Sequence, residues 1–248
     1  MAGMKDTIEE SARQTPVAAD VDVLVAGSGP AGIAAALAAA REGARTVLIE
    51  RYGYVGGMVT GANVIAIYGV GDGKVAKVRG VTLEIRKRLE KFGAVTPLRC
   101  GDYRVDPEVF KWQVVEMLLE AGVTLRFHTL ACAPILEAGT VAGAFTESKS
   151  GRQAIRANVT IDATADADLA FRAGCACDNV THEVTLGIQI EGVDKEKVAA
   201  FAKESPDEYQ IIVEEATKRN GGVMLGNKRL LKGIDVADAS ALTQAEIQ

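Results

Sequence analysis

Several residue patterns that mark particular classes of protein are missing from this chain of 248 residues. It contains only two histidines, His128 and His182, so a histidine-rich metal site is excluded. Its four cysteines include Cys175 and Cys177 in a C-x-C arrangement. That spacing is neither the C-x-x-C of redox dithiols and zinc sites nor the four grouped thiolates of an iron–sulfur cubane. We therefore expect reduced, mainly structural thiols and no metal.

Long apolar runs and clusters of one charge are also missing. No apolar stretch approaches the roughly 18 residues that a membrane-spanning helix needs. Residues 1–19, predicted to be an N-terminal arm, lack the apolar core of a signal peptide, so a cytoplasmic protein is expected. The net charge is −5, and Glu84 and Glu90 interrupt the basic stretch 74–91. This stretch is predicted to be a solvated helix face rather than a nucleic-acid surface.

The most informative segment runs from Asp22 to Glu50. An apolar strand leads into the motif Gly-Ser-Gly-Pro-Ala-Gly at 27–32, which an alanine-rich helix and a second strand follow. Gly27 permits the tight turn, Gly29 lets the backbone approach a pyrophosphate, and Gly32 allows close helix packing. The helix starts at this turn, so its free N–H groups and positive dipole end face the phosphates. The segment predicts a dinucleotide-binding βαβ unit.

Glu50 stands at the end of the second strand, at close to the usual spacing of roughly 20 residues from the glycines. A carboxylate there can accept hydrogen bonds from both hydroxyls of a ribose. It would repel a 2′-phosphate, which argues against NADP. The unit by itself does not select one dinucleotide.

The remaining chain predicts further elements of an α/β domain. Seven glycines between Gly53 and Gly73 indicate backbone that passes close to a ligand, with a plain surface loop as the alternative. Asp106 is expected to cap a helix that Gly122 ends, and Asp166 or Asp168 to cap a later helix or reach a cofactor. The other expected elements are helices over 81–92, 194–203 and 206–219 and strands over 123–127, 131–136, 141–146, 157–163 and 184–193.

Three segments together resemble a known family: VLVAGSGPAGIAAALAAAREGARTVLIER, YGYVGGM and VTIDATADADLAFRAG. They resemble FAD-dependent oxidoreductases of the two-dinucleotide-binding type, and most closely the proteins related to the flavin-binding subunit of heterodisulfide reductase. The resemblance implies an α/β fold in which a Rossmann-like FAD-binding domain, with a parallel sheet and an inserted β-meander, covers residues 20–180. It also implies that residues 181–248 open an α+β substrate domain.

The resemblance also implies a set of FAD-binding residues. The adenosine ribose would bind Glu50, with Arg51 beside the adenine. The residues expected to contact the cofactor are Gly27, Gly29, Pro30, Ala31, Gly32, Glu50, Arg51, Gly56, Gly57, Met58, Ala131, Cys132, Thr164, Ala165 and Asp166. Ala165 stands where the family usually has glycine, and its methyl group is tolerable if the backbone dihedral angles there are ordinary.

The reaction that the resemblance implies is hydride or electron transfer through flavin N5. No catalytic residue is assigned, although Thr60 and Asn63 are polar candidates. Because family members return to the nucleotide domain after the substrate domain, we expect this to be a partial chain or one that another subunit completes. Two alternatives remain: an electron-transfer flavoprotein subunit beside an iron–sulfur partner, and an inactive fragment with weak or no nucleotide binding. A small-molecule substrate or a redox protein is the expected partner, with a homo-oligomer possible.

Overall fold

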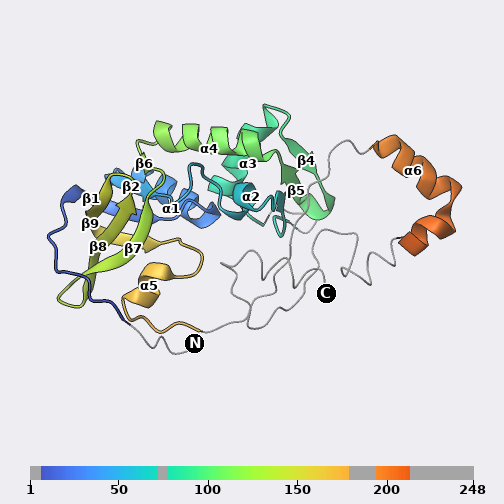
Figure 1. Cartoon of the computed structure of the whole chain (residues 1–248). Coiled ribbons are helices and arrows are strands. Elements are labelled where there is room, and N and C mark those ends of the chain that lie inside the picture. The colour runs from blue at the N-terminus through green and yellow to red at the C-terminus, as the bar shows by residue number, and fades with distance from the viewer. Residues whose placement is uncertain (1–6, 72–76, 179–193, 213–248) are drawn as a thin grey trace. The chain divides into compact units, whose positions relative to one another are not determined.

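The computed structural model describes residues 7–71, 77–178 and 194–212 (Figure 1). The chain divides into two compact units, Met1–Cys177 and Asp178–Gln248.

The first unit is built on a six-stranded sheet in the order β6-β2-β1-β9-β8-β7. Strands β6, β2, β1 and β9 run parallel, whereas β9, β8 and β7 form an antiparallel meander (Figure 1). This is the predicted α/β class with an inserted β-meander. The strands are β1 (Val17–Ala26), β2 (Thr46–Ile49), β6 (Thr124–Arg126), β7 (Leu130–Glu137), β8 (Thr140–Ser148) and β9 (Gly151–Asp162).

Strand β9 joins the two halves of the sheet. Its first residues pair with β8, and it also pairs with β1 from Ala154 to Asp162. The prediction placed this strand at 157–163 only, because Arg152, Gln153 and Arg156 break its apolar pattern. The prediction of an arm over residues 1–19 was wrong for its last residues, because Val17 and Ala19 pair with Ala154 and Ile155 inside the sheet.

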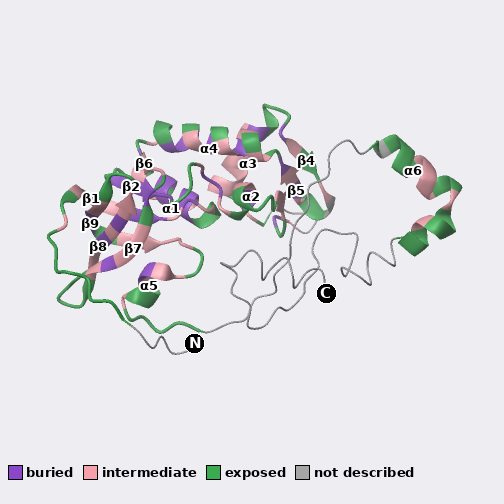
Figure 2. Cartoon of the chain, viewed as in Figure 1, coloured by how far each residue is buried: buried purple, intermediate pink, exposed green. Residues whose placement is uncertain are grey.

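Helices α1 (Pro30–Arg41), α3 (Val81–Glu90) and α4 (Pro107–Glu120) form a layer on one face of the sheet (Figures 1 and 2). Successive strand residues alternate between faces. Val25 and Leu48 pack under these helices, while Leu24, Val47 and Ile49 point to the other face. There they meet Ala144, Ile155 and Leu169 of β8, β9 and the short helix α5 (Asp168–Arg172).

The boundaries of α4 follow the predicted signals. The Asp106 side chain accepts hydrogen bonds from the backbone N–H groups of Glu108 at 2.8 Å and Val109 at 3.1 Å. Pro107 is the first helical residue, and the helix stops before Gly122, whose φ is +81°. These contacts satisfy backbone groups that a helix end otherwise leaves unpaired.

Three short strands form a second, antiparallel sheet in the order β3-β5-β4. They are β3 (Ala66–Ile67), β4 (Val95–Pro97) and β5 (Tyr103–Val105), and the helical turns α2 (Met58–Gly61) and η1 (Arg99–Gly101) lie in the same part of the chain. The sequence did not predict this sheet, because strands of two or three residues are too short to show alternation.

The second unit is described over residues 194–212. Helix α6 (Lys195–Glu204) corresponds to the helix expected over 194–203, and Asp194 caps it by accepting from the N–H groups of Glu196 and Lys197. Residues 206–212 are also helical. The rest of that predicted helix, the predicted strand 184–193 and His182 lie outside the described residues.

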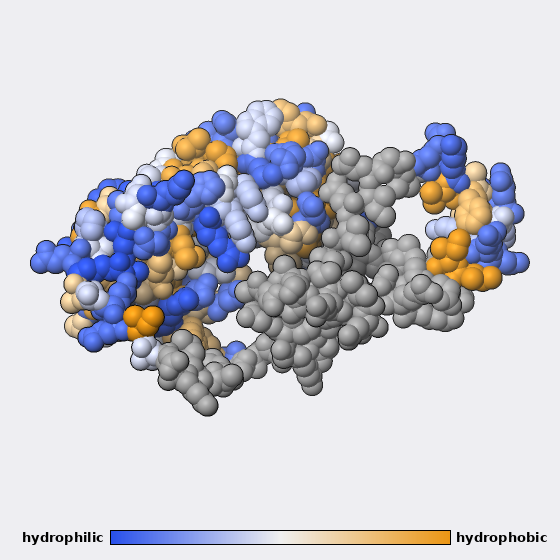
Figure 3. Space-filling view, viewed as in Figure 1, coloured by the Kyte–Doolittle hydropathy of each residue, from blue (hydrophilic) through white to orange (hydrophobic). Residues whose placement is uncertain are grey.

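Within the described ranges, no helix is both long enough and apolar enough to cross a membrane. Figure 3 shows hydrophilic side chains interspersed with small hydrophobic patches over the visible face of the first unit.

Replacing the cap of α4 tests how much this helix end contributes. Asp106→Ala is expected to lower the free energy of unfolding by about 1 kcal/mol, because two N–H groups lose their acceptor. Asp106→Asn is the matched control, since asparagine caps equally well. Urea denaturation of both variants checks the difference, and equal stability of the alanine and asparagine variants would contradict it.

Candidate functional site

The glycine turn lies at the carboxyl ends of β1 and β9. Ala163, just past β9, donates its N–H to the carbonyl of Ala26 at 2.8 Å, and Gly27 donates to Ile49 of β2 at 2.9 Å. From β1, the chain crosses over to β2 and later to β6, which both lie on one side of β1 in the sheet. Strand β9 lies on the other side of β1. The crevice at such a reversal of strand order is where open α/β sheets bind ligands.

The three motif glycines have different structural roles. Gly27 has a φ of +98°, and a Cβ atom there would lie 2.3 Å from the carbonyl oxygen of Ala163. A Cβ atom on Gly32 would lie 1.8 Å from the carbonyl oxygen of Gly27. Gly29 differs, because its φ is −65° and its Cβ would have no neighbour within 4 Å. The fold itself therefore requires Gly27 and Gly32, whereas Gly29 leaves space beside the turn.

The start of helix α1 lacks a charged or polar protein cap. Gly29 is the N-cap and has no side chain, Pro30 is the first helical residue, and no acidic residue lies in the first turn. Pro30 and Ala31 are exposed. The unpaired N–H groups and the positive end of the helix dipole therefore face open space, which suits an anion.

The segment around Gly56 and Gly57 packs on this turn. Gly56 donates its N–H to the carbonyl of Ser28 at 2.8 Å, and a Cβ on Gly57 would lie 2.9 Å from the Cα of Gly29. Both residues have positive φ, +116° and +54°. Met58 follows and is exposed. This part of the glycine-rich stretch therefore lies against the turn.

The two polar candidates in this stretch lie in different settings. The Thr60 hydroxyl donates to the carbonyl of Val55 at 2.6 Å and supports the loop beneath Gly56. Asn63 is exposed and has a φ of +52°.

Glu50 is buried and already holds three hydrogen bonds. Its Oε2 accepts from the backbone N–H of Ser28 at 2.9 Å and from the Ser28 hydroxyl at 2.6 Å. Its Oε1 accepts from the N–H of Tyr52 at 2.9 Å. Ser28 was not among the predicted site residues. The signal that could have found it is a hydroxyl residue inside the motif, next to the end of the strand that carries the acid.

Residues after Glu50 form a stacked column at the surface. The Arg51 guanidinium lies 4.7 Å from the centre of the Tyr52 ring, and the rings of Tyr52 and Tyr54 stack at 5.3 Å. Arg51 is exposed. The column fixes the course of the loop that leads from Glu50 to Gly56.

The predicted residues Ala131 and Cys132 are the second and third residues of β7, which follows a contact with Glu50. Thr129, two residues before Ala131, donates its N–H to the carbonyl of Glu50 at 2.9 Å. Burial raises the pKa of the Cys132 thiol above its usual value of 9.0, so this thiol stays protonated and unreactive at neutral pH. The structure thus brings the start of β7 to the same end of the site as Glu50.

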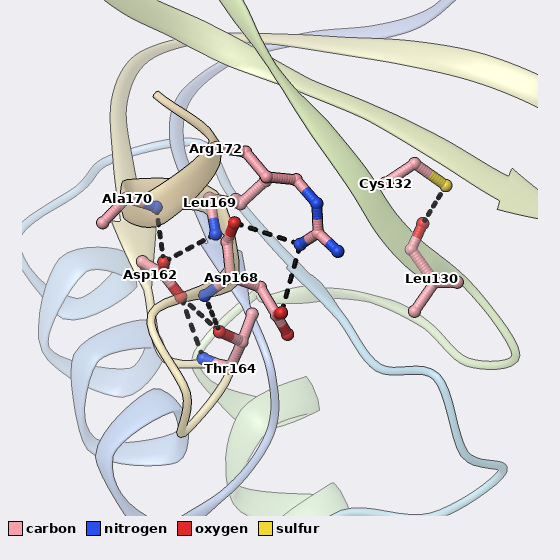
Figure 4. Close-up of polar contacts among 8 residues, drawn as sticks. All are labelled: Leu130, Cys132, Asp162, Thr164, Asp168, Leu169, Ala170 and Arg172. Atoms are coloured by element: carbon pink, nitrogen blue, oxygen red, sulfur yellow. Dashed lines mark hydrogen bonds and ion pairs between the residues drawn. The ribbon is translucent and has the colours of Figure 1, made fainter. Parts of the chain in front are cut away.

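Asp162, the last residue of β9, organises the loop that follows it (Figure 4). One carboxylate oxygen accepts from the N–H and the hydroxyl of Thr164, at 3.1 and 2.7 Å. The other accepts from the N–H groups of Leu169 and Ala170, both at 2.9 Å. Burial would raise the pKa of Asp162, but the hydrogen bonds from Thr164, Ala170 and Leu169 outweigh it and lower the pKa below 3.8.

These bonds correct the prediction of which residue caps α5. Helix α5 is capped by Asp162 and Thr164, and not by Asp166 or Asp168. Asp162 accepts from the N–H groups of Leu169 and Ala170, and the Thr164 hydroxyl accepts from the N–H of Asp168 at 2.9 Å. Asp168 instead pairs with Arg172 within the helix (Figure 4), while Asp166 is exposed.

The backbone of Ala165 is also not ordinary. Its φ is +78°, and that of Ala167 is +56°, in the left-handed region that favours glycine. An alanine in place of the family glycine is therefore strained. The hydrogen bonds to Asp162 hold the loop in this strained conformation.

Removing the methyl group at Ala165 tests this strain. Ala165→Gly is expected to raise the free energy of unfolding by about 1 kcal/mol, because glycine adopts positive φ without a clash. Ala170→Gly, inside α5, is the matched control and is expected to lower it by about 0.5–1 kcal/mol. Chemical denaturation of both variants measures the effect, and a destabilised Ala165→Gly would contradict the strain.

The lowered pKa of Asp162 predicts a pH dependence. Because the folded pKa lies below that of the unfolded chain, the carboxylate stabilises the fold above about pH 4 and loses this effect as the pH falls through the folded pKa. The stability difference between the wild type and Asp162→Asn is therefore expected to shrink below about pH 4. Urea denaturation between about pH 7 and pH 3 tests it. Asp166→Asn in the same loop is the control and should follow the wild type, and a constant difference for Asp162→Asn would refute the linkage.

Comparison with known proteins connects this site to a family. A family model described as "FAD dependent oxidoreductase" matches residues 22–241. The digeranylgeranylglycerophospholipid reductase of Methanoculleus marisnigri is 33% identical over 162 residues, which cover 62% of this chain and 41% of the reductase. The chain thus spans well under half of the curated relatives that it matches.

Solved structures with a similar course of the chain include two further proteins. The crystal structure of THI4 from Thermovibrio ammonificans has a TM-score of 0.49 and 23% identity, over 66% of this chain and 67% of that one. A geranylgeranyl bacteriochlorophyll reductase-like protein from Thermoplasma acidophilum has a TM-score of 0.46 and 22% identity, over 63% of this chain and 42% of that one.

The closer relation to heterodisulfide reductase stays a prediction. The family prediction is confirmed, because the family model covers most of the chain, including the glycine turn, Glu50 and the loop after β9. The chain belongs to the FAD dependent oxidoreductase family, and its cofactor is FAD.

Proposed function

We propose that the glycine turn, the Gly56–Gly57 segment and Glu50 together hold FAD. The pyrophosphate would lie over Gly29 and the start of α1, and the adenosine ribose at Glu50. The observation that carries the proposal is the open space at Gly29, where an added Cβ has no neighbour although the adjacent motif glycines are tightly packed. An uncapped helix start beside that space suits a pyrophosphate.

The remaining predicted residues would contribute through the backbone. Ala131 and Cys132 would meet the adenine, and Arg51 would lie at its edge. The N–H and hydroxyl of Thr164 are already bound to Asp162, which leaves the Ala165–Asp166 segment of this loop to approach the cofactor. Asp162 would thus act by holding the loop in position.

FAD, when bound, supplies hydride or electron transfer through its N5 atom. The described residues would bind and orient the cofactor, and residues 181–248 would form the opening of a substrate domain. For the whole protein we propose an oxidoreductase with a small-molecule substrate or a redox protein as its partner. A cytoplasmic location stays a prediction.

Purification of the chain tests the cofactor and the reaction class together. A yellow protein whose flavin absorbance bleaches with dithionite is expected. Re-oxidation by oxygen would favour an enzyme that works alone, whereas re-oxidation only by an added iron–sulfur protein would favour the electron-transfer alternative. A colourless protein that takes up no added FAD would refute the proposal and support an inactive fragment.

Gly29→Ala separates cofactor binding from folding. Its Cβ enters open space at an ordinary φ, so the unfolding midpoint of the variant without FAD is expected to equal that of the wild type. The methyl group would occupy the place of the pyrophosphate, and FAD affinity is expected to fall by about tenfold or more. Calorimetric titration with FAD measures it. Gly27→Ala is the contrasting variant and should fail to fold, while full FAD affinity in Gly29→Ala would contradict the placement.

A further inference from the structure

The hydrogen bonds on Glu50 leave little of its carboxylate for a ligand. A carboxylate offers about four acceptor positions, two on each oxygen. Ser28 fills both positions on Oε2 through its N–H and its hydroxyl, and the N–H of Tyr52 fills one on Oε1. One acceptor position therefore remains, and it is on Oε1.

The hydrogen bond from the Ser28 hydroxyl to Glu50 is shielded from water. Ser28 is 0% exposed and Glu50 is 7% exposed. A buried hydroxyl that loses its acceptor pays the cost of its desolvation, so the bond to Oε2 resists displacement. Its length of 2.6 Å is that expected for a hydroxyl bound to a carboxylate.

We propose that Ser28 is a specificity-determining residue, which restricts Glu50 to one hydrogen bond from the adenosine ribose. This rests on the proposed placement of FAD. With Oε2 closed by Ser28, one ribose hydroxyl binds Oε1 and the other makes no bond to Glu50. The motif by itself would allow both ribose hydroxyls to bind the carboxylate. In this structure that arrangement requires the Ser28 hydroxyl to break its hydrogen bond to Oε2.

Two FAD analogues distinguish these cases with the wild-type protein alone. One lacks the 2′-hydroxyl and the other the 3′-hydroxyl of the adenosine ribose, and calorimetry gives their dissociation constants. One analogue is expected to bind about tenfold or more weakly than FAD, because it loses a hydrogen bond to a charged group, and the other to bind like FAD. Equal weakening of both analogues, or of neither, would overturn the proposal.

Ser28→Ala is expected to remove the restriction and so to change how the two analogues bind. Loss of the hydroxyl frees one position on Oε2, so both hydroxyls can bind and both analogues are expected to bind about tenfold or more weakly than FAD. Ser150→Ala, which removes an exposed hydroxyl in the turn between β8 and β9, is the matched control and should keep the wild-type pattern. An unchanged pattern in Ser28→Ala would also overturn the proposal.

The experiments distinguish a failure of the proposed FAD site from a failure of the proposed role of Ser28. If the wild type binds FAD and both analogues weaken, the role of Ser28 is refuted while the FAD site stands. If the wild type binds neither FAD nor the analogues, the proposed function fails, and this inference fails with it. Should Ser28→Ala not fold, which its thermal unfolding would show, the comparison in the wild type still decides.

Discussion

The contact between the glycine turn and the end of β9 is the constraint on which the rest of this structure depends. Gly27 passes so close to the carbonyl of Ala163 that no Cβ fits, and Gly32 packs equally closely on Gly27. This allows α1 to start directly at the carboxyl edge of the sheet. The same closeness brings two loops together at this edge, the one after β1 and the one after β9.

Two carboxylates stabilise these loops. Glu50 anchors the turn at Ser28 and the loop at Tyr52, while Asp162 anchors Thr164 and the start of α5. Each accepts backbone N–H groups that have no partner in a helix or strand. The loops are therefore held in shape before a ligand arrives, which reduces the ordering cost of binding. Asp162 also holds two alanines at positive φ, so part of its bonding free energy offsets local strain.

Much of the nucleotide half was predictable because its signals are local. The order of strand, glycine turn, helix, strand and acid specifies the βαβ unit, and Asp106 and Gly122 mark the ends of α4. The true extent of β1 and β9 escaped prediction because it depends on partners distant in sequence. Val17 joins the sheet only because β9 lies beside it, and β9 is longer than its apolar pattern since the meander also pairs with it.

From the sequence alone, the glycine spacing indicated a dinucleotide site, because close approach of backbone to phosphate demands glycine at fixed positions, and the resemblance of three segments pointed to the family and to FAD. Only the tertiary structure decided which acids are available to a ligand. Ser28 binds an acid 22 residues further along the chain, and Asp162 binds N–H groups of residues seven and eight positions further on, so neither contact follows a helix or strand periodicity. Whether a carboxylate binds a ribose or its own backbone depends on which N–H groups folding places beside it. In this chain most acceptor positions of Glu50 and Asp162 are occupied by the protein itself.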